Sequence, residues 1–177
     1  VQRTDVRERY GTLAAAVGIL SNIFLCIIKG LIGLFSGSIA VTADAVNNLS
    51  DAGSSVITLL AFKIAGKPAD EEHPYGHARM EYISGMAVSF IIILLGLELM
   101  GSSFEKILHP EEVGVSALTY LVLIVSIAVK LWQGMFNRNL GKRISSEALQ
   151  ATAADSLNDV FSTGAVLLST LVYQFTA

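Results

Sequence analysis

Charged residues are scarce in this sequence, and their scarcity decides the class of protein. Asp, Glu, Lys and Arg make up 15% of the 177 residues, whereas 53% are hydrophobic; a soluble domain carries roughly 25% charged residues. Cysteine is almost absent, because Cys26 stands alone, which excludes an internal disulfide and a cysteine-based metal cluster. The first ten residues are polar and lead into an apolar run of span length, so no cleavable signal peptide is expected. This composition indicates an integral membrane protein.

Five apolar runs are long enough to cross a bilayer as helices, since about 20 residues span the hydrocarbon core. We expect these spans near residues 11–35, 39–65, 81–105, 114–136 and 146–175. The predicted fold class is therefore an all-α membrane protein, a transmembrane helix bundle.

The basic residues predict the orientation of the bundle. Lys106 alone flanks the first and third loops, whereas the other flanking cations border the N-terminus and the second and fourth loops. These are Arg3, Arg7, Arg9, Lys63, Lys67, Arg79, Arg138, Lys142 and Arg143. Because cytoplasmic loops carry the excess of Lys and Arg, the N-terminus is expected in the cytoplasm. Lys29 and Lys130 fall within spans; we expect Lys29 to snorkel to the outer interface and Lys130 to the cytoplasmic one.

Carboxylates inside two spans are the strongest functional signal. Asp44, Asn47 and Asp51 share one helix face in the second span, and Asp155 and Asp159 share one in the fifth. A carboxylate in hydrocarbon is costly and by default marks an ion, substrate or proton pathway. Counted at about 1.5 Å per residue, Asp51 and Asp159 both fall near the bilayer midplane. We predict a cation site shared between these two spans.

Oxygen donors at this depth favour a hard divalent cation such as Mn²⁺, Mg²⁺ or Ca²⁺, whereas zinc usually recruits His or Cys. Asn47 is the favoured amide ligand, because Asn48 points about 100° away from it. Asn48 and Asp44 are expected to line the pathway nearby. Glu98 in the third span belongs either to a proton or water pathway or to a polar helix contact. The alternative for the whole set is a structural role, with Ser, Thr and Asn on neighbouring helices satisfying the carboxylates.

The polar second loop carries a D-x-x-H-x-x-x-H array made of Asp70, His73 and His77. Mixed imidazole and carboxylate ligands suit zinc or another transition metal. Histidines that cap helix ends or contact lipid headgroups are an equal alternative. Arg79 follows at the start of the third span and is a candidate donor for an inter-helix ion pair.

Three stretches, at residues 38–51, 70–81 and 154–160, together resemble the cation diffusion facilitator family of metal-ion/proton antiporters. The resemblance covers nearly the whole chain. It implies a transport site formed by Asn47, Asp51, Asp155 and Asp159. Zinc-transporting relatives usually place His at one or more of these positions, so this set resembles the manganese-transporting branch. The loop residues match an accessory metal site seen in some relatives.

The resemblance also implies a domain organisation. Relatives typically have six spans and a cytoplasmic C-terminal domain that binds metal and helps the protein dimerise. Residues 1–177 are accordingly expected to be a transmembrane domain. The sixth span and the C-terminal domain are expected to lie outside this sequence. The residue that usually pairs with Arg79 is on that sixth span. We expect a homodimer in a bacterial inner membrane, in contact with lipid and not with nucleic acid.

The predicted function is secondary transport: a divalent cation, Mn²⁺, leaves the cytoplasm in exchange for protons, so the metal is a substrate and not a resident cofactor. Three aspartates exceed the charge of one divalent cation, which makes an exchange of metal for protons plausible. Efflux of Zn²⁺, Fe²⁺ or Co²⁺ by the same fold, a proton-independent cation channel and a structural subunit stay open as alternatives. An enzyme is not expected, because the sequence has no H-E-x-x-H motif and no span contains His.

Overall fold

A computed structural model describes residues 4–36, 39–108 and 117–176. Within these ranges the chain forms five helices and no strand, which confirms the predicted all-α class. The helices are α1 (Thr4–Ser36), α2 (Ile39–Ala65), α3 (Met80–Leu108), α4 (Ala117–Ile144) and α5 (Glu147–Thr176). Each predicted span corresponds to one helix. The predicted start of the fourth span, at residues 114–116, lies outside the described residues.

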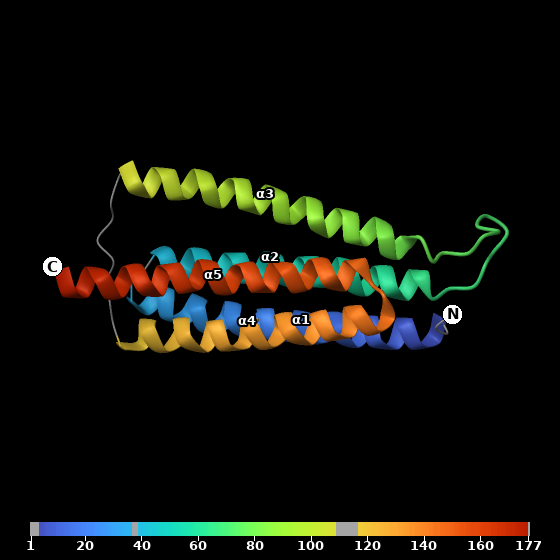
Figure 1. Cartoon of the computed structure of the whole chain (residues 1–177), viewed down its shortest axis with the longest axis horizontal. Helices are drawn as coiled ribbons and strands as arrows, with labels where there is room; N and C mark the ends of the chain where they lie inside the picture. Colours follow the sequence, from blue (N-terminus) through green and yellow to red (C-terminus); the bar gives the residue numbers. More distant parts are fainter. Residues whose placement is uncertain (1–3, 37–38, 109–116, 177) are drawn as a thin grey trace.

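Three helices in the described part of the chain are long and apolar enough to cross a membrane by themselves: Val6–Phe35, Met80–Glu98 and Ala117–Ile144. α2 and α5 have 27 and 30 residues and therefore also exceed the length of a span. Their Asp, Asn, Ser and Thr residues lower their hydropathy. Both helices run alongside the other three in Figure 1, so their polar side chains can be covered by neighbouring helices.

The bundle has α1, α2, α4 and α5 grouped together, with α3 along one edge where it contacts α2 and α5 (Figure 1). One face of α3 presents large apolar side chains that no other helix covers: Ile83, Met86, Phe90 and Ile93. Such an apolar surface suits contact with lipid. The N-terminal end of α1, the loop after α2 and the turn between α4 and α5 all lie at the same end of the bundle, as the cytoplasmic orientation requires.

The turn between α4 and α5 sets the depth of the residues that face each other across these helices. Ser145 adopts a left-handed φ of 51°, and the Ser146 backbone N–H donates to the carbonyl of Gly141 at 2.9 Å. The hydroxyl of Ser146 then accepts a hydrogen bond from the Leu149 N–H at 3.3 Å, which caps the first turn of α5. Because the turn is this tight, residues equally far from it on the two antiparallel helices lie at the same depth.

Gly33 lets α1 approach α2 closely. A Cβ at this position would lie 2.8 Å from the backbone nitrogen of Thr42 and would also collide with the Oγ1 atom of that residue. One turn earlier, a Cβ at Gly30 would meet only the Cβ of Ala45, at an ordinary 3.9 Å. The missing side chain is therefore required at Gly33, where the two backbones approach, and not at Gly30.

We expect Gly33→Ala to destabilise the folded chain by about 1–3 kcal/mol, because the clash with backbone cannot be relieved by a rotamer change. Unfolding in mixed detergent and SDS micelles, followed by circular dichroism, measures the loss. Gly30→Ala is the matched control and should change the free energy of unfolding little. Equal effects of the two substitutions would contradict the close approach at Gly33.

Candidate functional site

Three of the predicted carboxylates meet near the centre of the bundle. Asp51 from α2 and Asp155 and Asp159 from α5 each place a carboxylate oxygen within 4.8 Å of the other two. Asp51 is buried, and the two α5 aspartates are half-buried. Oxygens gathered this closely can bind one divalent cation. The depth count from the sequence thus correctly anticipates that α2 and α5 bring these groups together, while their role as ligands stays a prediction.

Asn47 on α2 joins this cluster by a hydrogen bond to α5. Its Nδ2 donates to Oδ1 of Asp159 at 3.2 Å, so the amide and the carboxylate lie in direct contact across the two helices. All four residues predicted for the transport site therefore lie together. Their donor atoms are carboxylate and amide oxygens, with no imidazole or thiolate in the cluster.

Lys130 is part of the same cluster, and the expectation that it snorkels to the cytoplasmic interface is wrong. Its side chain is 2% exposed, and its Nζ donates to Oδ2 of Asp51 at 2.5 Å and to Oδ2 of Asp159 at 2.6 Å. Lys130 lies fifteen residues before Ser145 and Asp159 lies fourteen after it. The tight turn therefore sets them at the same depth, where paired carboxylates stabilise the ammonium.

Lys29 is the second buried lysine, and its predicted outward snorkelling is also wrong. It is 1% exposed, and its Nζ lies 2.8 Å from Oδ2 of Asp44 on α2. The hairpin of α1 and α2 supplies this partner inside the bundle. Asp44 is consequently tied to α1 and does not join the three-carboxylate cluster.

The remaining predicted residues lie outside that cluster. Asn48 is fully buried and donates from Nδ2 to the carbonyl of Asp44 at 2.7 Å, leaving its Oδ1 without a partner among the described residues. Glu98 is exposed on α3. Arg79 is exposed and has no ion pair in the described part of the chain. The ion pair that joins α1 to α3 is instead Arg7 with Glu81, at 2.7 Å.

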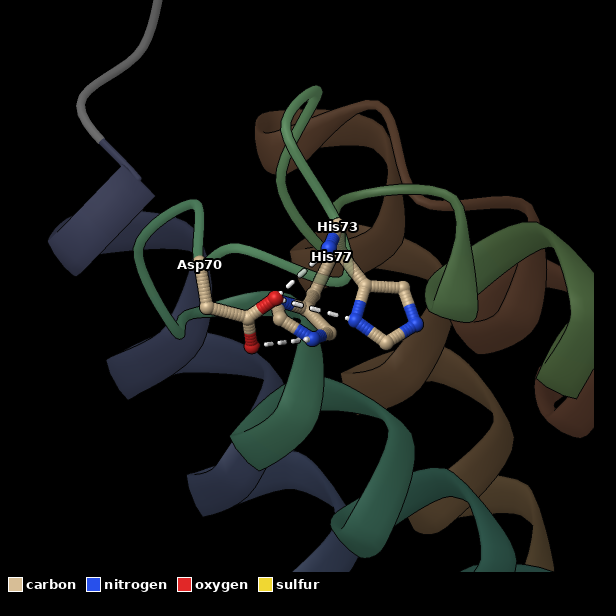
Figure 2. Close-up of side chains that lie close together, drawn as sticks. All are labelled: Asp70, His73 and His77. Carbon is tan, nitrogen blue, oxygen red and sulfur yellow. Dashed lines mark hydrogen bonds and ion pairs between the residues drawn. The ribbon is translucent and has the colours of Figure 1, made fainter.

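The loop between α2 and α3 holds the second predicted cluster (Figure 2). The carboxylate of Asp70 points toward both imidazole rings: Oδ1 lies 3.1 Å from Nδ1 of His73, and Oδ2 lies 3.5 Å from Nε2 of His77. The ring centroids are 4.5 Å apart. Two nitrogens and one carboxylate in this arrangement supply three of the four ligands that a tetrahedral zinc site needs.

A backbone hydrogen bond holds the Asp70 carboxylate in this position. The His73 backbone N–H donates to Oδ1 of Asp70 at 2.6 Å, and this bond is the main reason that the pKa of the Asp70 carboxyl lies below its ordinary value. The carboxylate therefore stays ionised, and able to bind a cation, to a lower pH than an ordinary aspartate.

We expect the loop cluster to bind Zn²⁺, and His77→Ala to weaken that binding by at least about tenfold, because one of three ligands is lost. Calorimetric titration of the purified chain with Zn²⁺ measures the change. Glu72→Gln, an exposed neighbour in the same loop, is the control and should leave the affinity unchanged. Zinc binding that His77→Ala does not affect would show that the two imidazoles serve another purpose.

Comparison with known proteins decides the family. The sequence model of a protein family, the cation efflux transmembrane domain, matches residues 15–177. The chain belongs to the cation efflux family, the cation diffusion facilitators. This confirms the resemblance drawn from residues 38–51, 70–81 and 154–160. The chain is a multi-pass integral membrane protein, and its bacterial relatives support the inner membrane as its location.

Curated relatives match over most of the length of this chain. The manganese efflux system protein MneS of Bacillus subtilis is 34% identical over 95% of this chain and 60% of its own length. An uncharacterized transporter of Methanocaldococcus jannaschii is 34% identical over 90% of this chain and 56% of its own length. The magnetosome protein MamB of Magnetospirillum gryphiswaldense is 30% identical over 85% and 51%. The chain thus spans between half and two thirds of the length of these relatives.

Proposed function

We propose that this chain is the transmembrane domain of a transporter that exports Mn²⁺ from the cytoplasm across a bacterial inner membrane in exchange for protons. The observation that carries the proposal is the cluster of Asp51, Asp155 and Asp159, with Asn47 bonded to Asp159. A set made only of oxygen donors favours a hard cation over zinc. The similarity to a protein named for manganese efflux supports the same choice of metal.

In this proposal the carboxylates bind the metal while the site faces the cytoplasm and release it once the site faces outward. Alternating access would move the helices that carry the site, α2 and α5, relative to their neighbours. Outward release is coupled to protons, because the aspartates that lose the cation take up protons from outside before the site returns. The proposed transporter acts as a homodimer, as in its family.

Binding is the first test of the proposal. We expect saturable binding of Mn²⁺ to the purified chain by calorimetry, competed weakly by Mg²⁺. Zinc is the informative competitor, since Zn²⁺ that binds only at the loop will not displace Mn²⁺ from the bundle. Complete displacement of Mn²⁺ by Zn²⁺ in a chain whose loop histidines are replaced would reverse the assignment of the metal.

Flux is the second test. Liposomes containing the chain and a Mn²⁺-sensitive dye should take up Mn²⁺ faster when their lumen is acidic than when the pH is equal on both sides. Uptake that saturates with Mn²⁺ and follows the pH gradient fits an antiporter. Uptake that rises linearly with Mn²⁺ and ignores the gradient would replace the antiporter with a channel.

A further inference from the structure

Lys130 lies where a metal would have to lie. Its Nζ contacts one oxygen of Asp51 and one of Asp159 at 2.5 and 2.6 Å. A hard cation such as Ca²⁺ takes carboxylate oxygens at about 2.3–2.6 Å, which is the same range. A divalent ion bridging these two carboxylates would therefore be in contact with the ammonium, and two cations at that distance repel strongly in a buried site.

The charges of the cluster are consistent with competition between Lys130 and a metal for the same carboxylates. When all three carboxylates are ionised, the single ammonium offsets one of three negative charges, and Asp155 has no ion pair among the described residues. In the absence of metal, the ammonium neutralises part of a carboxylate cluster that would otherwise repel itself. A divalent cation that binds the same oxygens of Asp51 and Asp159 has to displace the ammonium of Lys130 from them.

Two buried oxygens lie on α2 and α4, the helices that carry Asp51 and Lys130. Oδ1 of Asn48 and Oγ of Ser126 are buried, and neither has a hydrogen-bond partner in the described part of the chain; both residues are fully buried. An unpaired buried acceptor destabilises the folded protein, so we expect a donor to form a hydrogen bond with it. A lysine ammonium carries three N–H donors, which is enough for two acceptors.

The spacing places each acceptor about one helical turn from a residue of the cluster, measured along its own helix. Asn48 lies three residues before Asp51 on α2, and Ser126 lies four before Lys130 on α4, so both lie roughly 4.5–6 Å toward the N-terminal ends of these helices. The N-terminal ends of α2 and α4 lie at the same end of the bundle (Figure 1). A helical side chain leans toward the N-terminus of its own helix, which directs Lys130 toward this level.

We propose that Lys130 is a tethered cation that occupies the centre of the site in the metal-free protein and is displaced by the entering metal toward Asn48 and Ser126. The inference rests on the proposed function, because it assumes that Asp51 and Asp159 bind the transported cation. It assigns Lys130 the role of a residue that sets metal affinity: a cation that binds weakly cannot displace the ammonium. The lysine also keeps the empty carboxylate cluster paired while the metal-free site reorients.

Removing the tethered cation should therefore strengthen metal binding. In calorimetric titrations of the whole chain at neutral pH, we expect Lys130→Met to bind Mn²⁺ at least tenfold more tightly than the wild type. Lys130→Gln, which keeps a polar side chain, should show the same direction and guards against misfolding of the first variant. Lys29→Met is the matched control: it removes the other buried lysine, whose partner Asp44 lies outside the cluster, and should bring no gain in affinity.

A thermodynamic cycle tests the destination of the ammonium. Ser126→Ala and Asn48→Ala each remove an acceptor, and each should weaken Mn²⁺ binding by about threefold to tenfold while Lys130 is present. Both effects should disappear in the Lys130→Met background, since no ammonium then needs the acceptor. Losses that persist in that background would overturn the proposed destination.

The outcomes separate this inference from the function on which it rests. If the wild type binds Mn²⁺, Asp51→Asn abolishes the binding, and both Lys130 variants bind equally or more weakly, then Lys130 is a fixed counter-ion and the displacement is overturned while the function stands. If only the Lys130 variants bind Mn²⁺, the displacement is supported in its strongest form. If neither the wild type nor any Lys130 variant binds Mn²⁺, the proposed function fails and this inference fails with it.

Discussion

Replacing Asp51 by Asn is expected to weaken Mn²⁺ binding by at least about 100-fold. Asp51 is the most buried of the three clustered carboxylates, at 4% exposure, and water can substitute for it least well. Loss of an outer-shell partner typically costs 10–100-fold in metal affinity, and a direct ligand with a full charge should cost at least as much. Calorimetry with purified wild type and variant measures the difference.

The control for this variant keeps the helix bundle and removes a carboxylate elsewhere. Glu147→Gln lies in the first turn of α5, is exposed, and should leave Mn²⁺ affinity unchanged. Circular dichroism must show the same helix content in all three proteins. An affinity for Mn²⁺ that survives Asp51→Asn but is lost in His77→Ala would move the site from the bundle to the loop.

The helices could be predicted because apolar runs of span length leave little choice of structure in a bilayer. The convergence of Asp51 with Asp155 and Asp159 could be anticipated by counting depth from the span ends, because the rise per residue is fixed. Helix ends were less predictable: α1 begins at Thr4 and α4 ends at Ile144, beyond the apolar runs, since polar turns continue the helix outside the hydrocarbon.

The two buried lysines could not be placed in the same way. Snorkelling describes a lysine on a helix surrounded by lipid. Whether Lys29 and Lys130 face lipid or another helix depends on how the helices pack. The hydrophobic pattern of a single helix does not predict such a contact. For Lys130 one signal was available, because its distance from the turn at Ser145 differs by only one residue from that of Asp159. The contact between Lys130 and Asp51, 79 positions apart in the chain, has no such local signal.

Replacing Asp44 by Asn is expected to destabilise the folded chain by about 3–5 kcal/mol, because it leaves the buried ammonium of Lys29 without its counter-charge. Lys29 is 1% exposed, whereas the side chain of Asp44 is 28% exposed, so the two partners are not equivalent. Lys29→Met should cost less, because the remaining carboxylate is only partly buried. Unfolding in SDS and detergent mixtures, followed by circular dichroism, gives both values.

The double variant Lys29→Met with Asp44→Asn separates a buried charge from a general packing defect. If the cost of Asp44→Asn comes from the unpaired ammonium, the double variant should recover most of the stability lost in the single variant, since an apolar pair is often as stable as the ion pair it replaces. If the double variant is less stable than Asp44→Asn alone, the pair matters for packing between α1 and α2. The asymmetry between the two single variants would then be absent as well, because both would disturb the same interface.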